Sequence, residues 1–140
     1  MAISNNAFEL SLDTLAPSGS ITANRYYKEN GTVTIVKGDA SFMCVWFDAN
    51  STGERPTSPT WVAASESAPT TFSEDGNYYY HLILMDSVGN ESQVFNSDIT
   101  TFDKTPPEVT LVKINDGAIY TTNRKVAVYF EFNDPSCSGV

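Results

Sequence analysis

Positive charge is scarce in this sequence. Lys and Arg together number 8 against 17 Asp and Glu, which gives a formal net charge of −9 and an isoelectric point near 4.3. Because such a surface repels phosphates and anionic lipids, we expect neither nucleic acid nor a membrane as a partner. No stretch approaches the roughly 20 apolar residues that a membrane-spanning helix needs. The opening residues 1–7 also lack the basic residues and long apolar stretch of a signal peptide.

Cysteine and histidine are nearly absent. The two cysteines, Cys44 and Cys137, have no metal-ligand spacing, and the repeat described below assigns them to different domains, so we expect no disulfide within a domain. Cys44 lies in an apolar run and is predicted to be a buried thiol. The single histidine, His81, alternates away from the apolar side of its strand and is predicted to be exposed. Since no nucleophile motif is visible, we expect that the protein is not an enzyme.

Alternating strand patterns fill the rest of the chain. Hydrophobic residues make up 41% and aromatic residues 12%, enough for a packed core. No helical period is sustained, and turns such as Asn30-Gly31 separate short alternating segments. This pattern predicts an all-β fold, an antiparallel β-sandwich of about seven strands. Strands are expected over 20–24, 32–36, 42–47, 60–63, 78–86 and 93–102, with loops over 50–59 and 65–69.

One sequence motif occurs twice. An apolar residue, Asp and then Pro occur at Leu12-Asp13 to Pro17 and again at Phe102-Asp103 to Pro107. The two aspartates are 90 positions apart, and an alternating strand follows each time. This spacing is the size of one small sandwich. It divides the chain into an N-terminal segment 1–12 with a strand over 8–12, a sandwich over 13–102, and the first half of a second sandwich over 103–140.

The half-sandwich is predicted to have an unusual surface. Its expected strands, 108–114 and 125–132, would carry Val109, Leu111, Val126, Val128, Phe130 and Phe132 on their inward side, with Ile114 as a further candidate. Half a sandwich leaves such a face and its strand edges uncovered. Either the chain is part of a longer polypeptide, or another copy supplies the missing strands by strand complementation, which would make a homo-oligomer.

Three motifs carry a resemblance to a known family. Asp75-Gly76-Asn77-Tyr78, Asp86-Ser87-Val88-Gly89-Asn90 and Asp103-Lys104-Thr105-Pro106-Pro107 resemble the signature of bacterial and phage immunoglobulin-like repeats. The resemblance implies an immunoglobulin-like sandwich. The tract 74–80 is similar to a tyrosine corner, in which a tyrosine hydroxyl bonds back to the backbone near its turn. Tyr80 stands where antibody domains have a cysteine, so aromatic packing is expected in place of a disulfide.

The resemblance also implies a setting and a class of function. Such repeats serve as non-catalytic structural or adhesive modules of phage virions, in a tail, fibre or decoration protein, or of bacterial surface proteins, so an extracellular location is expected. The partners would be neighbouring protein subunits, or a glycan or protein of the host surface. The alternative is a carbohydrate-binding or spacer module of a secreted glycosidase.

Each candidate site residue can be explained by a structural role as well as by a functional one. Asp13, Asp86 and Asp103 fall at junctions and turns, where aspartates accept backbone N–H bonds, and the alternative is a calcium ion bound at the junction. No other cofactor is expected. Trp61, Tyr26 and Tyr27 are candidates for a ligand or subunit contact, whereas Trp46 is expected in the core.

Overall fold

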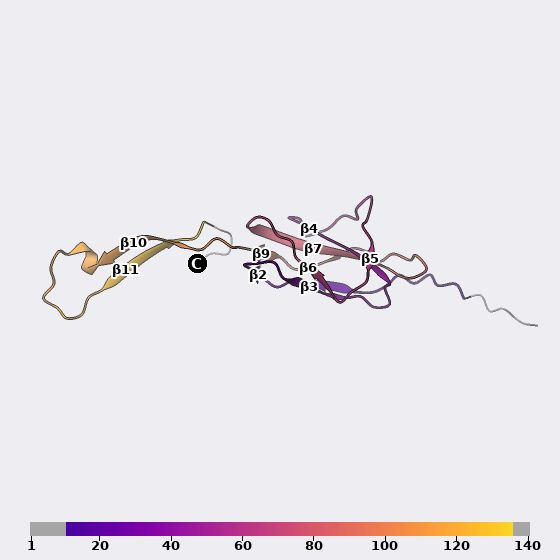
Figure 1. Cartoon of the computed structure of the whole chain (residues 1–140), viewed down its shortest axis with the longest axis horizontal. Helices are drawn as coiled ribbons and strands as arrows, with labels where there is room; N and C mark the ends of the chain where they lie inside the picture. Colours follow the sequence, from indigo (N-terminus) through magenta and orange to yellow (C-terminus); the bar gives the residue numbers. More distant parts are fainter. Residues whose placement is uncertain (1–10, 136–140) are drawn as a thin grey trace, which may run out of the picture.

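The computed structural model describes residues 11–135, which form an all-β structure of antiparallel sheets. Two sheets pack face to face as a sandwich, and a separate two-stranded hairpin extends from one end of it (Figure 1). The described chain begins at the opposite end of the long axis (Figure 1).

The smaller sheet has three strands. β3 (Thr32–Val36) lies between β1 (Ser20–Thr22) and β6 (Ser67–Pro69), and both pairings are antiparallel. β3 alternates between exposed and buried residues, with Val33 and Ile35 facing the core, as its period-two pattern predicts.

The larger sheet is built around β7 (Gly76–Met85), the longest strand, whose predicted inward residues are confirmed. Tyr80, Leu82 and Leu84 are buried in the core, and Tyr78 packs against it. β4 (Phe42–Asp48) runs antiparallel along one side of β7. The order across the sheet is β2 (Tyr26–Tyr27), β9 (Thr100–Phe102), β7, β4 and β5 (Val62–Ala63), with β8 (Phe95–Asn96) also pairing with β7.

Aromatic rings gather in the core around Phe72, which lies in the chain between β6 and β7, and its ring partners belong to the larger sheet. Phe72 stacks on Phe102 with ring centroids 4.8 Å apart, and it also contacts Tyr27, Tyr78 and Tyr80. Offset and edge-to-face aromatic pairs of this kind contribute about 0.5–1.5 kcal/mol each beyond the area they bury. Cys44 is a buried free thiol, as predicted.

Two short strands were missed by the sequence prediction. β6 lies where a loop was expected, because proline is tolerated at the end of an edge strand that pairs on only one side. β2 pairs with β9 in parallel, the one parallel contact of the described sheets. The single strand expected over 93–102 is divided into β8 and β9. Ser97 lies between these two strands, and its hydroxyl accepts the Tyr80 N–H at 2.9 Å. Ser92 lies before β8, and its hydroxyl accepts the Leu84 N–H at 2.9 Å.

The projecting hairpin pairs β10 (Glu108–Ile114) with β11 (Val128–Asn133), and a short 3-10 turn, η1 (Asn115–Gly117), follows β10. A β-bulge lies between Val109 and Leu111, where one residue of β10, Thr110, has no partner. The bulge reverses the alternation. Leu111 therefore pairs with Glu131 on the polar side, and the prediction that Leu111 faces inward was wrong.

The N-terminal strand expected over 8–12 falls mostly outside the described residues, and Ser11 and Leu12 belong to no strand. Cys137 also lies outside the described residues.

Candidate functional site

A loop covers part of the outer face of the larger sheet. On β4 and β7, the cross-strand pairs Cys44–Ile83 and Trp46–His81 point away from the sandwich core. Nevertheless Cys44, Ile83 and His81 are buried. The residues between β4 and β5 pass over this face, so the molecule has a second small buried layer. This arrangement accounts for the apolar residues on both sides of the segment 42–47.

His81 lies at the centre of this buried layer, and the prediction that it is exposed was wrong. Its side chain is 0% exposed. Its Nδ1 lies 2.7 Å from Asn96 Oδ1, and its Nε2 lies 3.3 Å from Asp48 Oδ1. Because Asn96 Oδ1 also accepts the Gly53 N–H at 2.9 Å, His81 Nδ1 is the donor to that oxygen. The Trp46 ring packs on the imidazole with ring centroids 5.4 Å apart, and Trp46 is half-buried here, outside the main core.

The covering loop is held at several points. At Gly53 the backbone passes so close to His81 that a Cβ atom would lie 2.4 Å from its Cγ. Further along, Arg55 forms a two-pronged ion pair with Glu91, with nitrogen–oxygen distances of 2.7 and 2.9 Å. This Arg55 contact lowers the pKa of the Glu91 carboxyl below its ordinary value. The loop is therefore fixed to β7, β8 and the β7–β8 connection.

Asp48 begins the loop as an ionised carboxylate. Partial burial opposes its ionisation, but the hydrogen bond from the Asn50 backbone N–H, at 2.6 Å, and the contact with His81 outweigh that effect. The pKa of Asp48 consequently lies below its ordinary value of 3.8.

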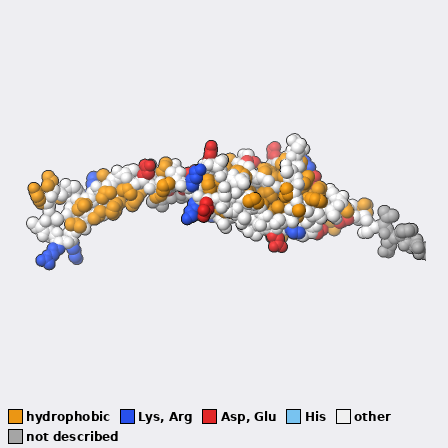
Figure 2. Space-filling model, viewed as in Figure 1, with side chains coloured by type: hydrophobic (Ala, Val, Ile, Leu, Met, Phe, Trp, Pro, Cys, Tyr) orange, Lys and Arg blue, Asp and Glu red, His pale blue; other side chains and the backbone are white. Residues whose placement is uncertain are grey.

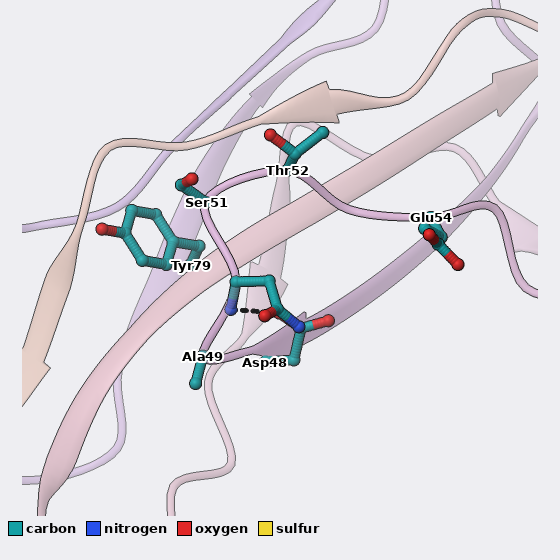
Figure 3. A pocket seen from close by; sticks show the side chains of 7 residues that line it. Asp48, Ala49, Ser51, Thr52, Glu54 and Tyr79 are labelled. Carbon is teal, nitrogen blue, oxygen red and sulfur yellow. Dashed lines mark hydrogen bonds between the residues drawn. The ribbon is translucent and has the colours of Figure 1, made fainter.

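A polar hollow lies where the loop leaves β4. It is open to solvent, has a volume of about 750 Å³, and is lined by Asp48, Ala49, Asn50, Ser51, Thr52, Glu54 and Tyr79. Figure 3 shows Ser51, Thr52 and Glu54 along the loop, with the Tyr79 ring on the neighbouring broad strand. Tyr79 is the cross-strand partner of Asp48. A second hollow of about 620 Å³ is also lined by Ser51 and Tyr79, and adds Ala23, Arg25, Ser97, Asp98 and Ile99.

The three candidate aspartates act as backbone acceptors. Asp86 Oδ1 accepts the N–H groups of Val88, Gly89 and Asn90 at 2.7–2.9 Å. Asp13 and Asp103 make hydrogen bonds of the same kind: in each, Oδ1 accepts the backbone N–H of the residue two positions later at 3.1 Å. These contacts agree with the turn role predicted for all three residues.

The structure brings only two of these aspartates together. Asn90 Nδ2 donates to Asp86 Oδ2 at 2.7 Å and to the Asp13 carbonyl at 3.1 Å. Asp103 lies at the other end of β7, where the adjoining Thr105 hydroxyl donates to Asp75. Within residues 11–135, no three carboxylate, thiol or imidazole side chains are grouped so that they could hold a metal ion.

The aromatic candidates do not form one platform. Tyr26 is 59% exposed, and the Arg25 guanidinium lies 5.6 Å from the centre of its ring. Tyr27 is buried, and its hydroxyl accepts the Asn24 N–H and donates to the Thr32 carbonyl. Trp61 is half-buried just before β5 and lines neither polar hollow.

An apolar face runs along the hairpin. The register places six side chains on one side of it, and each is about half exposed: Val109, Val112, Ile114, Val128, Phe130 and Phe132. Phe130 and Phe132 stack with ring centroids 6.1 Å apart. Hydrophobic side chains are prominent along this part of the molecule in Figure 2. We call these six residues the hairpin face.

Sequence reasoning correctly predicted Val109, Val128, Phe130 and Phe132 on the hairpin face, but it missed Val112 and the polar hollow. The available sign was the run 42–47, apolar on both sides and followed by a long polar loop, which indicates that the loop folds back over the strand. Nothing in the sequence identified Tyr79 as a lining residue of the hollow, because it lies between two core tyrosines.

None of the described elements is a helix long and apolar enough to cross a membrane. No protein-family model, curated protein or solved structure matches the chain.

Proposed function

We propose that this protein is a non-catalytic structural and adhesive module of immunoglobulin-like type, which acts as one link in an array of β-sandwiches. The observation that carries the proposal is the hairpin face, a row of apolar side chains that nothing covers within residues 11–135. A contiguous row of exposed apolar side chains is typical of a site of association.

The strand order supports the immunoglobulin-like part of the proposal. Strands β1, β3 and β6 share one sheet and β4, β7 and β9 share the other, as strands A, B, E and C, F, G do in immunoglobulin domains. The Tyr78 hydroxyl donates to the Glu74 carbonyl at 2.9 Å, four residues upstream. This bond is the one that a tyrosine corner makes, and Tyr78 stands two residues before Tyr80, which occupies the cysteine position.

The junctions support a repeated unit. After Asp13 the chain forms β1 and β3, an antiparallel pair, and after Asp103 it forms the antiparallel pair β10 and β11. In the sandwich, the inner face of β1 and β3 is buried against the other sheet through Ile21, Val33 and Ile35. The hairpin face is in the corresponding position but has no such cover, which supports its reading as the start of a second sandwich.

We infer that a second copy of the chain supplies the cover. The hairpin presents free strand edges and an apolar face, and an isolated two-stranded hairpin is marginally stable at best in water. It projects from the sandwich at the end opposite the described N-terminal residues (Figure 1), so successive copies can associate in a row. Such a row suits a phage virion or a bacterial surface, where we place the protein.

The state of His81 supports the non-catalytic part. Both imidazole nitrogens face Asn96 and Asp48 beneath the loop, so neither is placed to remove a proton from a nucleophile.

Light scattering on the purified chain tests this function. We expect a molar mass that rises with protein concentration, and loss of that rise in Phe130→Asp, which puts a charge in the hairpin face. Tyr129→Asp is the matched control, because Tyr129 is equally exposed on the other side of the same strand and should still associate. A monomer at every concentration would contradict completion by a second copy. Repeating the measurement with calcium and with a chelator tests the junction aspartates, and we expect no difference.

A further inference from the structure

We propose that the two polar hollows beside Tyr79 form one binding site for a neutral oligosaccharide. The hollows share Ser51 and Tyr79, so a chain-like ligand that crosses the Tyr79 ring would occupy both. This inference deepens the adhesive part of the proposed function and rests on it, but it concerns a surface separate from the hairpin face.

The first support is that the site is already formed. The loop that makes one wall is attached through Gly53 to Asn96 and through Arg55 to Glu91, and it rests on the buried His81. The other wall is β7 itself, the longest strand of the sandwich. A ligand therefore pays little to order the protein when it binds, which matters most for weakly bound ligands such as sugars.

The second support is the chemistry of the lining. Among the hydrogen bonds of the described chain, none involves the side chains of Ser51, Thr52 or Glu54, so their oxygens are free to bond to ligand hydroxyls. Tyr79 adds an aromatic ring with a polar end, a surface on which the C–H face of a sugar can pack while its hydroxyls remain bonded. A site of hydroxyls, carboxylates and one ring fits a polyhydroxylated ligand better than a lipid or an apolar peptide.

The third support is charge, which selects among sugars. Asp48 and Glu54 line the first hollow and Asp98 the second, against the single guanidinium of Arg25. Arg25 is partly committed, since it donates to the Ile99 carbonyl at 3.3 Å and lies beside the Tyr26 ring. The net negative surroundings disfavour sialic acids, uronic acids and phosphorylated glycans. The site should therefore accept neutral sugars.

The test is a titration followed by amide NMR on the whole chain. The probes are neutral tetrasaccharides of glucose, of galactose and of N-acetylglucosamine, with a tetrasaccharide of galacturonic acid as the anionic comparison. We expect saturable shifts at residues 50–54 and 79 with at least one neutral probe, at a dissociation constant of about 1 mM or below. The anionic probe should bind about tenfold more weakly or not at all.

Variants separate the site from the rest of the surface. Tyr79→Ala should weaken binding by about tenfold or more, and Tyr79→Phe, which keeps the ring, by no more than about threefold. Tyr79→Ala truncates a side chain within β7 and therefore also changes the packing of the strand, so Ser51→Lys gives a second check. Ser51 is exposed on the loop, and a long side chain there should block both hollows. Trp61→Ala is the control and should bind normally.

Two results would overturn the inference. One is the absence of saturable shifts with every neutral probe at about 10 mM. The other is binding that is unchanged in both Tyr79→Ala and Ser51→Lys, which would place the sugar elsewhere. Neither result would affect the mass of the wild-type chain in light scattering, so the failure of this site and the failure of the array are distinguishable.

Discussion

At the scale of single residues, two tyrosines on β7 place their hydroxyls in opposite environments. The Tyr78 hydroxyl donates to the Glu74 carbonyl at 2.9 Å. The Tyr80 hydroxyl is buried, and within the described chain it has no well-formed hydrogen bond, with only a weak contact to the Thr71 backbone. Burial, together with the nearby Tyr27, raises the pKa of Tyr80.

Removing the one hydroxyl or the other should therefore affect the free energy of unfolding differently. We expect Tyr78→Phe to lower the free energy of unfolding by about 1 kcal/mol, the usual net value of one hydrogen bond. Tyr80→Phe should leave that free energy unchanged or raise it by up to about 1 kcal/mol, because it removes a buried polar group that is poorly paired. Urea unfolding of both variants measures the difference. A larger loss in Tyr80→Phe than in Tyr78→Phe would show that the Thr71 contact is a full hydrogen bond.

The outcomes for individual residues show what alternation can predict. It correctly placed Tyr80, Leu82 and Leu84 in the core, because each faces the opposite sheet. It failed for His81, since alternation gives the side of a sheet on which a residue lies but not whether a loop covers that side. Only the three-dimensional path of the chain around Gly53 reveals the cover.

At the scale of elements, the turn after β7 is built on one carboxylate. Asp86 accepts four hydrogen bonds from Val88, Gly89 and Asn90, three to its Oδ1 and one to its Oδ2. Gly89 supports the turn with a φ of +99°, which other residues rarely adopt. Burial opposes ionisation of Asp86, but the bonds from Asn90, Val88 and Gly89 outweigh it and lower the pKa.

The turn should therefore be sensitive to pH. Because the pKa of Asp86 is lowered in the fold, its stabilising contribution is present above its ordinary value of 3.8 and is lost as the pH falls below that value. We expect Asp86→Ala to melt at a lower temperature than wild type at pH 7, and the difference to shrink towards about pH 2.5. Thermal melts across this range measure it. A difference that stays constant with pH would mean that the carboxylate charge has no role.

Element boundaries were less predictable than element identity. The strands with strong alternation, β3 and β7, lie where the sequence places them. The edge strands β2 and β6 have two and three residues, too few for a period to be recognised, and they depend on their neighbours for pairing. The bulge at Thr110 also could not be predicted, because its cause is the register between two strands.

At the scale of the whole molecule, two parts differ in how they are stabilised. The sandwich has an enclosed core of aliphatic and aromatic side chains. The hairpin is held by its ladder and by contacts along one apolar face, and at its tip Ile119 and Tyr120 are 86% and 90% exposed. The domain boundary at Asp103 stays a prediction of the sequence repeat.

This difference should be visible in hydrogen exchange. We expect the amides of β10 and β11 to exchange at least about a hundredfold faster than those of β4 and β7 when the protein is dilute, since an isolated hairpin opens locally. At concentrations where copies associate, hairpin protection should rise while that of the sandwich stays the same. Equal protection of both parts in dilute solution would mean that the hairpin is stable without a partner.

The parallel contact between β2 and β9 has a mechanical consequence. The backbone N–H groups of Thr101 and Asp103 donate to the carbonyls of Arg25 and Tyr27 at 2.9 and 2.8 Å, so the second strand and the last strand of the sandwich are bonded side by side. Tension applied at the two ends of the molecule pulls these strands past each other and loads their bonds together. A row of such links would resist stretching at each link, because no bond in this pair can yield before its neighbours share the force.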